Sequence, residues 1–190
     1  MSNLNDIKNS ILFLKKNGLR NNKIVLFHCT SSYPAQNSEL NLNVLDLFKE
    51  KFDLEVGYSD HSLSQMTPLI AVAKGCKYLE KHITLNKKLT GPDHKASFDI
   101  DQFRKMINNL REAEIILGQK EKKIQKGEKE NSFYVRKSLF AKNNIKIGEK
   151  FSLKNLTTKR PFSGVSSVKW PKYLGRKSKK NYLKGEKINE

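Results

Sequence analysis

The chain has 190 residues, of which 37% are hydrophobic, and a formal net charge of +18. This length allows one medium-sized domain or two small ones, each with a hydrophobic core. No segment approaches the roughly 18 consecutive apolar residues that cross a bilayer, and the first residues are polar. The sequence therefore predicts neither a membrane helix nor a secretory signal, and we expect a cytoplasmic protein.

The cysteines give no sign of a covalent framework. Cys29 and Cys76 form no CxxC pair, and both fall in segments predicted to be buried. A disulfide or a zinc knuckle is not expected, and we interpret both residues as small core side chains.

The charge is unevenly distributed along the chain. Residues 1–118 hold 16 Lys and Arg against 13 Asp and Glu, whereas residues 119–190 hold 21 against 6. Between these parts, Gln119–Asn131 contains a single apolar residue, Ile124, as a solvated segment does. We therefore predict a first domain at 1–118, a charged linker at 119–135 and a second domain at 136–190. A basic domain can bind nucleic acid, but these lysines are scattered without a recognition motif, so attraction of anionic substrates explains the charge more simply.

Helix and strand patterns alternate along the first domain. A helix ending near Gly18 precedes strands predicted at 23–29, 54–58 and 77–84, and helices predicted at 40–52, 67–74 and 101–117 separate or follow them. This alternation favours a parallel α/β architecture of the (β/α) barrel type. An eight-stranded barrel needs about 250 residues, so we expect only its last three strands here.

Three short polar motifs follow the predicted strands. They are HCTSSYP at 28–34, GYSDH at 57–61, and EKH at 80–82 together with GPDHKAS at 91–97. Because the carboxyl ends of parallel strands meet at one edge, these motifs predict a shared site. His61 and His82 would lie near each other there, either as metal ligands or as ordinary hydrogen-bonded histidines.

The tail has a different pattern. Segments 136–165 and 174–188 contain short alternating stretches punctuated by glycines at 148, 164, 175 and 185. This spacing predicts a small β-rich fold.

Taken together, the motifs resemble the back half of the sialic acid synthase family, with legionaminic acid synthases as close relatives. The tail resembles that family's antifreeze-like (SAF) domain, and the match extends from about residue 1 to about 188. The resemblance implies condensation of phosphoenolpyruvate with N-acetylmannosamine or a related N-acylated aminosugar. The products would be a nine-carbon 2-keto sugar acid, destined for surface polysaccharide, and phosphate.

The resemblance also implies roles for the residues after the strands. His61 and His82 would hold a divalent ion, Mn²⁺ or Mg²⁺, that polarises the sugar aldehyde. Ser59 would contact the phosphate or carboxylate of phosphoenolpyruvate. Ser31 is expected to bind substrate, and it stands where relatives often carry a small polar residue such as asparagine.

Four more residues are expected to bind the sugar. Tyr33 and Asp93 would hydrogen-bond its hydroxyls, although Asp93 is also a common turn residue after Gly-Pro. Arg160, in the KRP motif, would contact the N-acetyl group in the partner's barrel of a homodimer, and Tyr134 would lie near that pocket or pack the linker. We assign no role to the other polar residues of the motifs, which are His28, Cys29, Asp60, Glu80, Lys81 and His94.

The opening of the chain resembles the loop and helix that follow the family's fifth strand. The lysines and the glutamate with which the family grips phosphoenolpyruvate lie on earlier strands, so we expect residues 1–190 alone to be inactive. The alternative hypotheses are a non-catalytic carbohydrate-binding or assembly module and, with charge alone in its favour, a nucleic-acid binder.

Overall fold

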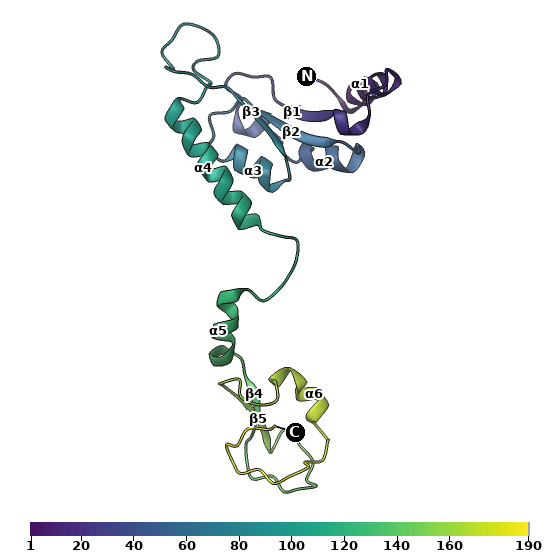
Figure 1. Ribbon diagram of the computed structural model, residues 1–190, viewed down its shortest axis with the longest axis vertical. Coiled ribbons are helices and arrows are strands. Elements are labelled where there is room, and N and C mark those ends of the chain that lie inside the picture. Colours follow the sequence, from purple (N-terminus) through teal and green to yellow (C-terminus); the bar gives the residue numbers. More distant parts are fainter. Residues whose placement is uncertain (190) are drawn as a thin grey trace. The chain divides into compact units, whose positions relative to one another are not determined.

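The computed structural model describes residues 1–189 and divides into two compact units, residues 1–119 (unit 1) and 120–190 (unit 2) (Figure 1). Unit 1 is a three-stranded parallel sheet with helices, and unit 2 is a small β-rich fold. Within the described residues, no helix has the length and apolarity to span a membrane.

The sheet of unit 1 has the strand order β1-β2-β3, and all neighbours are parallel. The register sets Phe27 opposite Gly57, which is opposite Tyr78, and it ends with Asp60 opposite Lys81. Helices connect successive strands, as the sequence predicts for a partial (β/α) barrel. The elements are α1 (Leu4–Lys16), β1 (Val25–Cys29), α2 (Val44–Lys51), β2 (Glu55–Asp60), α3 (Thr67–Ala73), β3 (Tyr78–Lys81) and α4 (Ile100–Leu117).

Local signals explain where the long helices begin. Asn3 and Asp6 form a capping box at the start of α1, and Asp99 and Gln102 form another at the start of α4. The helix predicted from residue 40 begins only at Val44, because a 3₁₀ turn at residues 37–39 and a left-handed Asn41 (φ 41°) precede it.

The two faces of the sheet have different surroundings. Leu45 and Phe48 of α2 pack on Val56 and Tyr58, and Ala71 of α3 joins the same core, so we call this the helix-covered face. On the opposite face, which we call the open face, Phe27 is 38% exposed and Tyr78 is 43% exposed. The strand predicted to be buried at 23–29 is therefore only half-buried, because β1 is an edge strand.

Unit 2 is organised around one antiparallel strand pair. Strand β4 (Ser138–Ala141) pairs with β5 (Leu156–Lys159), and single bridges tie β4 to Ser166 and Lys187. A short helix, α6 (Trp170–Tyr173), packs against the core. The buried core side chains are Leu139, Ala141, Ile145, Phe151, Leu156, Tyr173, Tyr182 and Ile188.

The stretch predicted as a charged linker contains a helix, α5 (Lys126–Val135). Gln125 and Glu128 form a capping box that favours helix formation despite the lack of an apolar stripe. None of its residues is buried, so the segment is solvated as predicted but is not irregular along its whole length.

Candidate functional site

The two histidines lie side by side at the carboxyl ends of neighbouring strands. His61 follows β2 directly and His82 follows β3 directly, one residue beyond the Asp60–Lys81 pair that closes the ladder. Their ring centroids are 5.1 Å apart, and the rings cross at 80°. The strand ends therefore bring together the imidazoles of two motifs that are 21 positions apart in the sequence.

His61 is held in a defined orientation. Its Nδ1 lies 2.9 Å from the carbonyl oxygen of Thr30, and its own carbonyl accepts a hydrogen bond from the Ala35 amide. Because a carbonyl can only accept, Nδ1 is the donor of this hydrogen bond. A backbone carbonyl on one ring nitrogen is the usual arrangement of a metal-ligating histidine.

A phenol and a carboxylate border the imidazoles. The Tyr33 ring lies 4.2 Å from the His61 ring and 5.6 Å from the His82 ring, measured between centroids. An Asp93 carboxylate oxygen lies 3.8 Å from His82 Nδ1, and the Asp93 carbonyl accepts hydrogen bonds from Ala96 and Ser97. Two residues that sequence resemblance associated with sugar hydroxyls are thus next to the histidine pair.

Ser59 links the site to a residue without a predicted role. Its buried hydroxyl donates to Glu80 Oε1 at 2.5 Å and lies 3.5 Å from His61 Nε2. The period of two along β3 places Tyr78, Glu80 and His82 on one face, and this signal could have assigned Glu80 to the site. Ser31 is exposed and lines a hollow between α1 and β1 instead.

The donor set defines what kind of ion fits. Among residues 1–189, no group of three or more His, Cys, Asp or Glu side chains is arranged to hold a metal. The two imidazoles alone supply two ligands, so an ion held by them would take its remaining ligands from water and substrate. Imidazole suits several divalent transition metals.

A buried ion pair lies beneath this edge, on the helix-covered face. Lys81 Nζ is 3.1 Å from Asp60 Oδ2, and the two side chains are 1% and 0% exposed. Burial lowers the pKa of Lys81 below its usual value, although the Asp60 carboxylate acts in the opposite direction.

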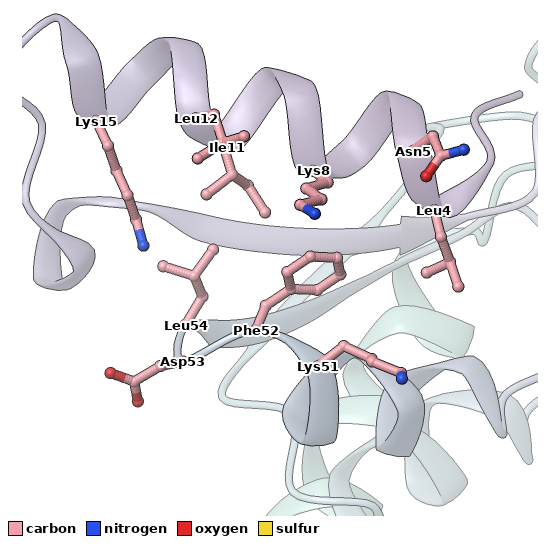
Figure 2. Close-up of a pocket in the computed structure, with 10 residues that line it drawn as sticks. All are labelled: Leu4, Asn5, Lys8, Ile11, Leu12, Lys15, Lys51, Phe52, Asp53 and Leu54. Carbon is pink, nitrogen blue, oxygen red and sulfur yellow. The ribbon is translucent and has the colours of Figure 1, made fainter.

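A separate hollow lies at the opposite end of the strands (Figure 2). Its apolar lining comes from α1 and from Phe52 and Leu54, which lead into β2, and three lysine side chains border it. None of the predicted site residues lines this hollow.

In unit 2, the predicted sugar-binding residues Arg160 and Tyr134 lie near each other at the C-terminal end of α5. The Arg160 Nε donates a 2.8 Å hydrogen bond to the Val135 carbonyl, next to Tyr134 in α5. The Tyr134 side chain is 70% exposed and its ring contacts Phe133 edge-on. The structure therefore groups Arg160 with Tyr134 on the surface of this unit.

A parallel strand–helix unit with polar groups at its strand ends, joined to a small β-rich unit, is the architecture of a two-domain α/β enzyme. Family comparison makes the assignment specific. The NeuB family matches residues 1–122, and the SAF domain matches residues 136–189. The chain belongs to the NeuB family, which confirms the resemblance to sialic acid synthases.

Several of its relatives are named as legionaminic or pseudaminic acid synthases. The chain is 44% identical over 190 residues to N,N'-diacetyllegionaminic acid synthase of Campylobacter jejuni, covering 100% of this chain and 57% of the relative. It is 36% identical over 171 residues to pseudaminic acid synthase of the same species, covering 90% and 50%. The chain spans about half the length of the curated relatives it matches.

Solved structures agree with the fold. N-acetylneuraminic acid synthetase from Leptospira borgpetersenii superposes with a TM-score of 0.62 at 31% identity, covering 69% of this chain and 45% of that one. A spore coat polysaccharide biosynthesis protein E from Chromobacterium violaceum superposes with a TM-score of 0.76 at 21% identity, covering 98% and 56%. The latter similarity concerns the fold alone.

Proposed function

We propose that this chain forms part of a synthase that condenses phosphoenolpyruvate with an N-acylated aminosugar such as N-acetylmannosamine. The observation that carries the proposal is the His61–His82 pair at the ends of adjacent strands, bordered by Tyr33 and Asp93. Membership of the NeuB family supports the reaction class.

The reaction joins two carbon atoms. The methylene carbon of phosphoenolpyruvate bonds to the aldehyde carbon of the open-chain sugar, whose oxygen takes up a proton. Water adds at the enol carbon, and the C–O bond to phosphate breaks, which leaves a 2-keto acid and inorganic phosphate. The protein contributes mainly positioning and charge stabilisation.

Side chains at the strand ends are proposed to bind the metal ion and the two substrates. A divalent ion, Mn²⁺ or Mg²⁺, bound by His61 and His82 would supply Lewis-acid polarisation of the aldehyde. Tyr33 and Asp93 bind sugar hydroxyls, a role supported by their distances to the imidazoles. Ser59 donates to phosphoenolpyruvate when it is released from Glu80. The contact of Ser31 with substrate stays a prediction.

Unit 2 supplies the acyl-group contact, and we place it in a homodimer. Arg160 uses one donor on Val135, and its exposed guanidinium keeps further donors for the carbonyl oxygen of an N-acyl group. Tyr134 beside it offers an exposed ring to the same group. In this proposal both residues act on the partner's barrel.

Residues 1–190 by themselves are not expected to turn over. Lys81, which directly precedes His82, is committed to Asp60 and to the Ser62 carbonyl, so it does not offer its charge to a phosphate. The phosphate-binding cations are proposed to come from residues outside this chain.

The test combines metal binding with reconstitution. The chain is co-expressed with the part of the Campylobacter jejuni synthase that precedes the matched region, and phosphate release from phosphoenolpyruvate is measured. We expect release that requires both Mn²⁺ and aminosugar, and its loss in His61→Ala and His82→Ala. The matched control is His28→Gln, because His28 lies on the helix-covered face against Leu40 and Tyr58.

Two outcomes would contradict the proposal. Reconstituted activity that survives both histidine substitutions would remove the metal role. Phosphate release by purified residues 1–190 alone, dependent on Mn²⁺ and aminosugar, would show that the site is already complete.

A further inference from the structure

The buried Asp60 carboxylate fixes the backbone on both sides of His61. Its Oδ1 accepts the Ser62 amide at 2.9 Å, which closes a tight turn around the histidine. Its Oδ2 accepts the Thr67 hydroxyl at 2.8 Å, which ties the turn to the start of α3. Lys81 and the Tyr58 hydroxyl are further donors, so the carboxylate accepts four hydrogen bonds although it is fully buried.

Lys81 links this turn to the segment that holds His82. Its Nζ donates to Asp60 and to the Ser62 carbonyl, so both ends of the His61 turn are bonded to β3. The same ammonium lies 4.2 Å from the centre of the Phe98 ring, and the Phe98 amide donates to the His82 carbonyl. The contacts of Lys81 therefore reach the two residues that flank His61, and also Phe98, which is hydrogen-bonded to the backbone of His82.

We propose that Asp60 and Lys81 are positioning residues that set the separation and angle of the His61 and His82 imidazoles. This inference rests on the metal-binding function proposed above. The alternation of side chains along a strand supports it, because the ion pair points to the helix-covered face while the next residue on each strand points to the site. A charged pair that only joined β2 to β3 could lie anywhere along the ladder. The exposed Lys77–Glu55 pair, at the start of both strands, is such a case.

The test measures imidazole geometry directly. The chain has only four histidines, so the ring protons of His61 and His82 can be assigned by NMR in residues 1–190. At a centroid distance of 5.1 Å, the two rings should give a nuclear Overhauser effect. We expect Lys81→Met to abolish this effect at a temperature where circular dichroism shows the variant to be folded. Leu45→Ala, which creates a cavity in the core of unit 1, should lower the melting temperature and keep the effect.

A second variant guards against loss of folding. Asp60→Asn with Lys81→Met leaves no unpaired buried charge, and replacement of both partners is far better tolerated than removal of one. It also lacks the Lys81 bond to the Ser62 carbonyl, so the imidazole contact should again be lost. In parallel, titration with Mn²⁺ alone, followed by electron paramagnetic resonance, should show an affinity about tenfold lower in both variants, as for the loss of other outer partners of metal ligands.

The outcomes separate this inference from the proposed function. An unchanged Overhauser effect in the folded Lys81 variants would overturn the positioning role, as would a Mn²⁺ affinity within about twofold of the unaltered chain. If the unaltered chain binds no Mn²⁺, the metal proposal fails, while the Overhauser effect still decides whether the ion pair positions the rings.

Discussion

Gly57 provides a sharp test of the open face of the sheet. A Cβ added to this residue would lie 2.7 Å from Cε1 of the Phe27 ring, so the ring would have to move by about 0.7 Å to reach the ordinary contact distance of 3.4 Å. The ring also contacts Tyr78 at a centroid distance of 6.4 Å, and this contact would be weakened. Overpacking of this kind costs ~1–3 kcal/mol.

The stabilisation gained by replacing a strand glycine is smaller than this overpacking cost. Replacing a strand glycine by alanine otherwise stabilises by ~0.5–1 kcal/mol, so Gly57→Ala should destabilise unit 1 by a net ~1 kcal/mol. With an unfolding entropy of ~2.1 cal/mol/K per residue, a unit of this size should melt ~4 °C lower. In a Phe27→Ala background there is no ring to displace, and the same glycine substitution should become stabilising.

Differential scanning calorimetry is the appropriate assay, because the two units can melt separately. Trp170 is the only tryptophan and lies in unit 2, so its fluorescence transition serves as an internal reference that should not shift. A Gly57→Ala transition equal to or above that of the unaltered chain, with Phe27 present, would refute the placement of the ring over β2.

Two further predictions concern burial and close backbone contact. Burial raises the pKa of Cys76 from 9.0 to about 11, so it should react with iodoacetamide at pH 8 more than ~10-fold slower than Cys29. Because the folded state keeps this proton longer, Cys76 should make the free energy of unfolding fall as pH rises from 9.0 to about 11, and Cys76→Ala should reduce that fall. Equal alkylation rates would contradict the burial. Gly164→Ala would place a Cβ 2.5 Å from a backbone oxygen, so it should lower the free energy of unfolding by ~3 kcal/mol or more, measured by urea unfolding followed by Trp170 fluorescence. The control is Gly127→Ala in α5, which meets open space and should stabilise slightly. Equal unfolding midpoints for the two variants would exclude the close contact.

The sequence was sufficient to predict the sheet and the histidine pair. Both follow from local rules, since parallel strands share a carboxyl edge and the residue directly after each strand lies there. His61 and His82 needed no knowledge of loop conformation to be paired. The apolar pattern of α4 is less informative at the end of the helix. Ile115 and Leu117 are 80% and 51% exposed, because the helix extends past the core formed around Met106.

Contacts that depend on loop closure could not be derived from the sequence pattern. Asp93 reaches His82 because Thr84 bonds to His94 at 2.8 Å and closes the intervening loop, and no periodicity encodes that bond. The burial of Lys81 was hidden for a related reason. A lysine next to a site histidine suggests a ligand contact, and only its contacts with Phe98 and Asp60 show that its charge points to the helix-covered face.

Alternation along the strands explains why each motif joins a charged residue to a histidine. In SDH and in EKH, the residue before the histidine points to the helices and the histidine points to the site. A slip of β3 by one residue against β2 would turn the side chains of β3 to the other face, so that His82 would point to the helices and Lys81 would point away from Asp60. The Asp60–Lys81 pair thus opposes the register error that would destroy the site, because the slipped register would leave the Asp60 carboxylate buried without its Lys81 partner.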